Sequence, residues 1–240
     1  MPTQSVKLLR REKVAEGTMA FYFEKPSGLE FKPGQYLDCT LTHPPETDSE
    51  GNIRSFSIAS APAEPDLMLA TRLRDTAFKR VLSTMPLGSE LQIDGPMGSF
   101  TLHKNVSRPA VLLAGGIGIT PFRSMIVHNS HNGLAPRIVL FYSNRRPEDA
   151  TFLNELREMG SDNKMFRAVC VMTEMEKSNR PWKGETGYLD KDMLARYVPD
   201  FSAPIYYIAG PPAMVAATTE ILKKIGINED DMRAEDFAGY

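Results

Sequence analysis

The chain has 240 residues, with 28 Lys or Arg against 30 Asp or Glu and a formal net charge of −2 at pH 7. This balance excludes the basic surplus that non-specific nucleic-acid binding requires. The sequence contains no apolar run near the ~20 residues of a membrane span, and its cation-rich start lacks the apolar core of a signal peptide, so we expect a cytoplasmic protein.

The two cysteines, Cys39 and Cys170, each lie in an apolar, strand-like run. Two thiols cannot supply the four ligands of a plant-type iron–sulfur cluster, and we expect both to be buried and free. The sequence has no HExxH or CxxC pattern, so we expect no metal site.

The first hundred residues have the pattern of short strands. Apolar and polar residues alternate in the segments 18–23, 35–41, 54–59, 67–74 and 90–95. Turn-forming Gly and Pro residues separate these segments, and a single helix is expected over 76–85. Many short strands with few helices predict an antiparallel barrel.

From residue 110 onward the pattern changes. The segments 110–114, 137–143, 166–172 and 204–209 are nearly continuous apolar runs that alternate with helical stretches. This alternation predicts a parallel sheet with helices on both faces. We expect helices over 147–159 and 211–225, ending at Gly160 and Gly226, and a further helix capped by Thr120. Ser107-Arg108-Pro109 resembles a linker, which predicts domains over 1–105 and 106–240.

Two glycine motifs follow strands of the predicted parallel sheet. "LLAGGIGITPF" (112–122) places three glycines after the first strand, and "IAGPPAMV" (208–215) ends another strand in Gly-Pro. Ligands bind outside the carboxyl ends of such strands, and a loop without Cβ atoms lets a pyrophosphate approach the start of a helix. A tight turn without a ligand is the alternative for each motif.

In the first half, "RSFSIAS" (54–60) combines a cation, an aromatic ring and hydroxyls on one strand. Arg54 and Phe56 share one side of this strand, and Ser57 lies on the other. These groups suit a phosphate, a planar ring and a ring edge, although an ordinary half-buried strand has the same pattern.

The order RSFSIAS, GPMGSF (95–100), LLAGGIGITPF, IAGPPAMV and a terminal EDFAGY resembles the ferredoxin–NADP⁺ reductase superfamily, in particular its small bacterial FAD-dependent members and the reductase modules of oxygenase systems. The resemblance covers essentially the whole chain. It implies an antiparallel Greek-key barrel that binds FAD, less readily FMN, followed by a five-stranded parallel Rossmann-like domain that binds NAD(P).

The resemblance also implies roles for residues of the barrel. Arg54 would pair with a flavin phosphate, Phe56 would pack against the isoalloxazine, and Ser57 would hydrogen-bond near its N5 atom. Many relatives have Tyr in place of Phe56, and the start of the 76–85 helix departs from their Gly-x-x-Ser pattern. The further flavin contacts implied are Thr71, Arg72, Thr76, Ala77 and Phe78, with Phe237 or Tyr240 covering the free face of the ring.

For the nicotinamide nucleotide, the resemblance implies contacts from Gly115, Gly116, Gly118, Thr120, Gly210 and Pro211. Thr120 would lie beside the nicotinamide and act in catalysis together with Phe56 and Ser57. Ser143, Asn144, Arg145 and Arg146 follow the second strand and suit the 2′-phosphate of NADPH, whereas Glu174 would repel it; Arg145 and Arg146 could equally be solvent-exposed cations at a helix start. The balance favours NADPH slightly.

The implied activity is hydride transfer from NAD(P)H to bound FAD, with electrons passed to a separate ferredoxin, flavodoxin or oxygenase component. One alternative is a reductase of small acceptors such as quinones, ferric chelates or free flavin. Another is a flavin- or nucleotide-binding subunit of a larger complex that does not turn over alone. We expect a monomer.

Overall fold

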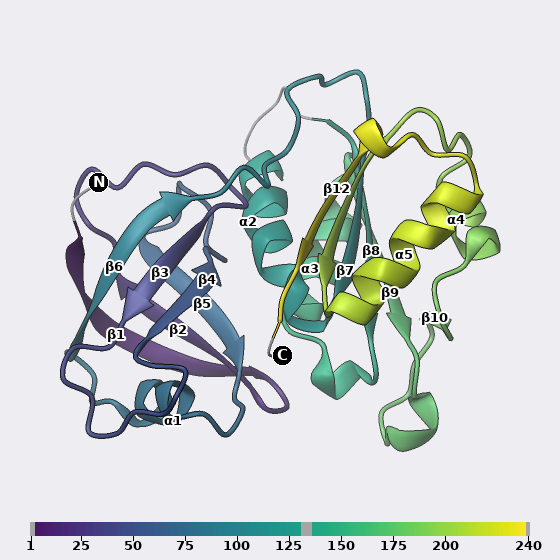
Figure 1. Cartoon of the computed structure of the whole chain (residues 1–240). Coiled ribbons are helices and arrows are strands. Elements are labelled where there is room, and N and C mark those ends of the chain that lie inside the picture. Colours follow the sequence, from purple (N-terminus) through teal and green to yellow (C-terminus); the bar gives the residue numbers. More distant parts are fainter. Residues whose placement is uncertain (1–2, 131–135, 239–240) are drawn as a thin grey trace.

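The computed structural model describes residues 3–130 and 136–238, which form two packed units, a barrel and a parallel sheet with helices on both faces (Figure 1). In the described residues, both cysteines are buried and free, as the sequence predicted. No described helix is long and apolar enough to cross a bilayer.

The first unit is an antiparallel sheet of six strands in the order β4-β3-β6-β1-β2-β5. The backbone N–H of Ala59, just after β4, donates to the carbonyl of Met68 on β5 at 2.8 Å, so the two ends of the sheet meet and the sheet closes as a barrel. Its elements are β1 (Gln4–Ala15), β2 (Thr18–Glu24), β3 (Tyr36–Thr40), β4 (Ile53–Ser57), β5 (Asp66–Arg72), α1 (Ala77–Thr84) and β6 (Glu90–Met97).

The sequence pattern does not predict strand β1. Only Val6 and Leu8 on it are buried, and the following residues through Lys13 are exposed on both faces. An exposed, charged stretch carries no alternating pattern, so its pairing with β2 and β6 is decided by the rest of the barrel.

The second unit is a sheet of six parallel strands in the order β10-β9-β8-β7-β11-β12. The sequence predicts five strands, whereas the structure has six. The difference arises from short strands such as β10, which is only two residues long and leaves no apolar run in the sequence. The predicted fold class is confirmed. The strands are β7 (Ala110–Gly115), β8 (Ile138–Asn144), β9 (Phe166–Met172), β10 (Glu185–Thr186), β11 (Ile205–Gly210) and β12 (Met232–Asp236).

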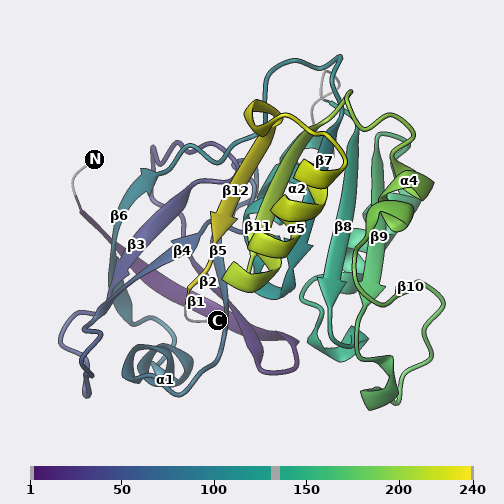
Figure 2. The ribbon, with the colours of Figure 1, turned by 45° about the vertical axis from the view of Figure 1, so that its right-hand side comes forward.

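Two apolar clusters show which helices cover which face of this sheet. Side chains of α2 (Ile119–Ser130) and α3 (Leu153–Asp162) pack on one face, and those of α4 (Lys191–Tyr197) and α5 (Pro212–Lys224) pack on the other. In Figure 2, α5 lies in front of the sheet and α2 behind it. The strand order reverses between β7 and β11, which makes the carboxyl ends of these two strands the expected ligand site.

The helix predicted over 147–159 is interrupted. It consists of a 3₁₀ turn, η2 (Pro147–Asp149), and of α3, because Phe152 between them has a left-handed φ of 59°. Gly160 does not end α3, contrary to the prediction. A Cβ at this glycine would lie 3.2 Å from the backbone N of Ala168, so Gly160 allows α3 to approach β9 closely.

Thr120 is not the N-cap that the sequence suggested. The 3₁₀ turn η1 (Gly116–Gly118) leads directly into α2, which starts one residue before Thr120. The Thr120 hydroxyl donates instead to the carbonyl of Ile117 at 3.0 Å. The side chain is thereby held against the turn that precedes the helix.

The two units meet at a small apolar cluster. Ala59, Met68 and Ala70 of the barrel pack with Ile117 of η1, and Phe237 packs beside them. The segment that follows β12 therefore returns to the barrel at Phe237, and Figures 1 and 2 show β12 as the strand of the second unit that runs toward the barrel. The segment that links the units also packs on the second one, since the Phe100 ring lies 5.7 Å from that of Phe122.

Candidate active site

A cleft of about 720 Å³ lies between the barrel and the parallel sheet. From the barrel it is lined by Tyr36, Glu50, Arg54, Ser55, Phe56, Ser57, Ala70, Arg74, Thr76 and Lys79. From the second unit it is lined by Ile117, Thr120 and residues 235–238. The strand motif at 54–57 and Thr120 in the first turn of α2 thus face one space.

Strand β4 presents its predicted flavin residues to this cleft. Phe56 is 4% exposed, and its ring centroid lies 5.8 Å from that of Phe78. The Arg54 guanidinium donates to the carboxylate of Glu50 at 2.6 Å and lies 3.7 Å from that of Asp48. Arg54 is therefore held by the acidic loop 43–52 in a position that faces the cleft.

Lys79 and Arg74 add two cations to the same wall. Lys79 is only 5% exposed. Burial lowers the pKa of Lys79 to about 8, and the nearby charges of Arg74 and Arg54 act in the same direction. An anion placed among these cations would relieve both effects, so the cluster fits the pyrophosphate of FAD.

The start of helix α1 lies beside these cations. Thr76 is the N-cap, and its hydroxyl accepts a hydrogen bond from the backbone N–H of Lys79 at 3.4 Å. The N–H of Ala77 donates to the carboxylate of Asp48 at 2.7 Å, and this contact lowers the pKa of Asp48. A carboxylate thus already covers a backbone donor of the kind that phosphates use.

Other predicted flavin residues do not line the cleft. Thr71 and Phe78 are each 1% exposed, and Phe78 belongs to the barrel core. Arg72 ends β5 outside the lining. A flavin contact from these three side chains stays a prediction.

The three glycines after β7 have different surroundings. A Cβ on Gly118 would lie 2.2 Å from the carbonyl oxygen of Ala209, and one on Gly115 would lie 3.1 Å from Met214 and Pro211. These two positions need glycine for packing. None of the three glycines lines the cleft, but Gly116 has a φ of +52°, and apart from its chain neighbours no residue lies within 4 Å of the point that its Cβ would occupy. It therefore borders open space, as a backbone that receives a ligand does.

Gly210 and Pro211 lie against this loop. A Cβ on Gly210 would approach Gly115 to 3.1 Å, so the carboxyl ends of β7 and β11 are held in contact. Neither Gly210 nor Pro211 lines the cleft. Their packing supports the loop of Gly116, and direct contact with a nucleotide stays a prediction.

The C-terminal segment closes the cleft from the side of β12. Phe237 lines the cleft, whereas Tyr240 falls outside the described residues. Glu235 also lines the cleft, and its buried Oε2 has no hydrogen-bond partner among the described residues. Burial, followed by the neighbouring charge of Asp236, raises the pKa of Glu235. An unpaired polar oxygen in a cleft suits a ligand that offers a hydrogen bond.

The candidates for the nucleotide 2′-position lie at the ends of β8 and β9 and not in the cleft. Arg145 is exposed and lies 3.7 Å from Glu174. Arg146 is held by two carboxylates, at 2.8 Å from Asp149 and 2.6 Å from Glu16. Ser143 pairs with Gly115 in the sheet register.

Several residues that line the cleft are absent from the sequence-based predictions of site residues, among them Tyr36, Arg74, Lys79 and Glu235. The cation-rich stretch "RLRDTAFKR" (72–80) was a usable signal for Arg74 and Lys79. Glu235 begins the terminal EDFAGY motif, but the motif did not indicate its burial, which depends on the return of the chain end to the barrel. Among the described residues, no group of His, Cys, Asp and Glu could hold a metal ion.

A cation-lined barrel cleft that faces the glycine-rich edge of a parallel sheet defines a flavin- and nicotinamide-nucleotide-binding oxidoreductase. Comparison with protein families agrees. Residues 5–102 match the oxidoreductase FAD-binding domain, and residues 112–220 match the oxidoreductase NAD-binding domain. The chain therefore consists of an oxidoreductase FAD-binding domain followed by an oxidoreductase NAD-binding domain, the two domains that the resemblance to the ferredoxin–NADP⁺ reductase superfamily implies, and its cofactors are FAD and a nicotinamide nucleotide.

Two curated relatives have similar sequences. The glycine betaine monooxygenase reductase subunit of Chromohalobacter salexigens is 31% identical over 223 residues, which are 92% of this chain and 60% of that protein. The propane 2-monooxygenase reductase component of Rhodococcus jostii is 32% identical over 219 residues, or 89% of this chain and 57% of that protein. The chain thus spans about three fifths of the length of these relatives.

A solved structure shows the same fold at nearly the same length. The ferredoxin NADP⁺ reductase from Neisseria gonorrhoeae, with bound FAD and NADP, has a TM-score of 0.80 and 21% sequence identity, and the match covers 98% of this chain and 99% of that one.

Proposed function

We propose that the protein oxidises NADH or NADPH and passes the electrons through bound FAD to a separate acceptor protein, an electron carrier or an oxygenase component. The observation that carries this proposal is that the 54–57 strand of the barrel and Thr120 of the second unit line the same cleft. Bound FAD would supply the chemistry, because it accepts a two-electron hydride and can release electrons singly.

The protein's own task in this proposal is placement. Arg54, Arg74 and Lys79 hold the negative charge of the pyrophosphate, while Phe56 and Ser57 position the ring. Thr120 and the open backbone at Gly116 position the nucleotide. Glu235 provides a hydrogen-bonding group at the cleft wall beside Phe237.

The nature of the acceptor comes from the relatives. Two relatives are named as reductase components of monooxygenases, which supports a protein acceptor. A direct reductase of small acceptors is the second enzyme candidate from the sequence. The cytoplasmic location, the monomeric state and the domain division at 105/106 also belong to this proposal.

The test is anaerobic reduction of the purified, FAD-loaded protein. We expect NADH or NADPH to bleach the yellow colour, and the reduced protein to reduce a ferredoxin, a flavodoxin or an oxygenase component faster than it reduces quinone or ferric chelates. A protein that binds FAD but is not bleached by either nucleotide contradicts the proposal.

The charges near β8 and β9 favour NADH over NADPH, in contrast to the slight preference drawn from the sequence. The sequence interpretation requires arginines available for a 2′-phosphate. Arg146 is already balanced by Asp149 and Glu16, and Arg145 lies next to Glu174. A 2′-phosphate would meet these carboxylates here, so we expect a lower half-saturating concentration for NADH. Glu174→Gln should reduce the difference between the half-saturating concentrations of NADH and NADPH.

A further inference from the structure

A buried arginine joins the two units beside the cleft. Arg123 lies on α2, and its side chain is 9% exposed. The guanidinium donates to the backbone carbonyl of Ala59 at 2.9 Å and to both carboxylate oxygens of Glu64 at 2.9 and 3.0 Å. Ala59 and Glu64 belong to the barrel, whereas Arg123 belongs to the second unit.

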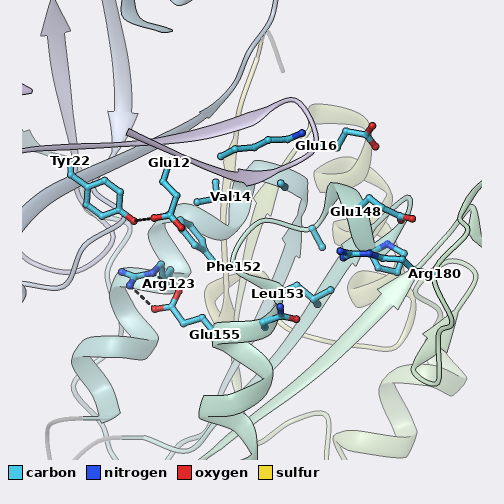
Figure 3. A pocket seen from close by; sticks show the side chains of 15 residues that line it. Glu12, Val14, Glu16, Tyr22, Arg123, Glu148, Phe152, Leu153, Glu155 and Arg180 are labelled. Atoms are coloured by element: carbon cyan, nitrogen blue, oxygen red, sulfur yellow. Dashed lines mark hydrogen bonds and ion pairs between the residues drawn. The ribbon is translucent and has the colours of Figure 1, made fainter. Parts of the chain in front are cut away.

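On its other side, Arg123 bonds within its own unit. Its Nε and Nη2 donate to the two oxygens of Glu155 on α3 at 2.9 and 2.5 Å. Figure 3 shows Arg123 and Glu155 together at the wall of a second hollow, of about 690 Å³, with Phe152 beside them. The guanidinium lies 5.2 Å from the Phe152 ring. The Arg123 guanidinium is therefore held by hydrogen bonds to residues of both units.

The barrel partners of Arg123 are themselves held firmly. The carboxylate of Glu64 accepts a 2.6 Å hydrogen bond from the backbone N–H of Ala61. The buried hydroxyl of Ser124, next to Arg123, donates to the carbonyl of Ser60 at 2.7 Å. Burial alone would lower the pKa of Arg123, but the hydrogen bonds with Glu64 and Glu155 raise it above its usual value, so the side chain stays charged.

These contacts lie close along the chain to the residues that face the cleft. Ala59 follows Ser57 by two residues, and Arg123 follows Thr120 by three, within about one helical turn. The junction of Arg123, Ala59 and Glu64 therefore couples the position of Ser57 to that of Thr120. Another ion pair between the units, from Arg146 to Glu16, lies at the hairpin tip, where the Glu16 side chain is 56% exposed.

We propose that Arg123 is a positioning residue that sets the separation of the flavin and nicotinamide sites by joining Ala59 and Glu64 of the barrel to helix α2. This inference rests on the proposed function. Hydride transfer requires reacting atoms about 3–3.5 Å apart, and a misplacement of about 1 Å costs on the order of a hundredfold in rate. Arg123 does not line the cleft, so it acts through Ser57 and Thr120.

Glu64 and Glu155 provide a matched pair of variants, because each binds the same guanidinium through two oxygens but only Glu64 lies in the other unit. In anaerobic stopped-flow experiments with saturating NADH, we expect Glu64→Gln to slow flavin reduction about tenfold and Arg123→Met about a hundredfold. We expect Glu155→Gln to stay within about threefold of the unchanged protein. Arg123→Lys, which keeps the charge, should recover part of the loss.

Four further measurements separate positioning from a general loss of structure. The FAD dissociation constant and the half-saturating NADH concentration should change less than about threefold in Glu64→Gln. The long-wavelength charge-transfer absorbance between nicotinamide and flavin should weaken in this variant. Hydrogen exchange of the amides in 58–61 should become faster in the FAD-bound protein without nucleotide.

Equal reduction rates and equal charge-transfer absorbance in Glu64→Gln and Glu155→Gln would overturn the inference, even if Arg123→Met does not fold. Failure of the proposed function looks different, because the unchanged protein itself would then bind no FAD or resist bleaching.

Discussion

The carboxylate of Asp48 accepts a 2.7 Å hydrogen bond from the backbone N–H of Ala77, the first residue of α1. The same carboxylate lies 3.7 Å from Arg54, so a negative side chain sits among the groups proposed for the flavin pyrophosphate. We expect Asp48→Asn to bind FAD more tightly, because the amide oxygen still accepts the Ala77 hydrogen bond but no longer repels a phosphate.

The measurement is the FAD dissociation constant at low and high salt. The advantage of Asp48→Asn should shrink at high salt, since screening weakens charge repulsion. Weaker binding by the variant at every salt concentration would show that Asp48 supports the flavin.

Arg54 should be required for retention of the flavin. Arg54→Ala removes a charge-assisted hydrogen bond to phosphate, which is worth about 1.5–3 kcal/mol, so the FAD dissociation constant should rise about ten- to a hundredfold. Arg54→Lys keeps the charge, so its FAD dissociation constant should lie between those of the unchanged protein and of Arg54→Ala. Full flavin occupancy in purified Arg54→Ala contradicts the assignment.

Lys79 should make FAD binding dependent on pH. Its pKa of about 8 lies below the ordinary 10.5, and a bound phosphate would raise it. FAD affinity should therefore fall on the order of tenfold as the pH rises from about 7 to about 9.5, because binding then requires a proton. Titration of flavin fluorescence in the protein and in Lys79→Met tests this, and the variant should show a smaller dependence.

In the flavin-free protein, Lys79 should make the free energy of unfolding rise with pH, whereas FAD affinity falls with pH. Between pH 8 and 10.5 the unfolded chain binds more protons at Lys79 than the folded one, so this residue makes the free energy of unfolding rise with pH. Urea unfolding of the protein and of Lys79→Met across this window isolates the contribution.

Gly116 and Gly118 should respond differently to substitution. Gly118→Ala places a Cβ 2.2 Å from the Ala209 carbonyl and should lower the free energy of unfolding by about 1–3 kcal/mol. Gly116→Val has room for its side chain, with a backbone strain of about 1–2 kcal/mol, and should remain yellow. Its half-saturating NADH concentration should rise more than about tenfold, as bleaching titrations can measure. Normal bleaching of Gly116→Val would remove Gly116 from the nucleotide site.

Glu235 should destabilise the flavin-free protein as its carboxyl ionises. Its pKa is raised above 4.5 by burial and by Asp236. The folded protein then holds this proton more tightly than the unfolded chain, so the free energy of unfolding falls as the pH rises from 4.5 through the raised pKa. Glu235→Gln lacks this decline. If the free energy of unfolding changes with pH in the same way for the unchanged protein and for Glu235→Gln from about pH 4.5 to about pH 8, Glu235 does not have a raised pKa.

Much of the fold could be read from local patterns. Strands β7, β8, β9 and β11 are buried along most of their length, and such strands appear as apolar runs in any sequence. Strand β1 was not predicted because its exposed half has no alternating apolar pattern. Helix α3 begins later than predicted because Phe152 has a left-handed backbone conformation, which its residue type does not indicate.

The sequence by itself determined the two-part architecture and led to Arg54, Phe56, Ser57 and Thr120, four residues that line the cleft, because these features depend on the order and spacing of neighbouring residues. Only the tertiary structure decided which charges are balanced and which glycines serve packing. Arg146 meets Glu16, Arg123 meets Glu64, and Gly118 meets Ala209 across large separations in the chain. Burial and charge neutralisation arise from contacts between distant segments, and local sequence carries no record of them.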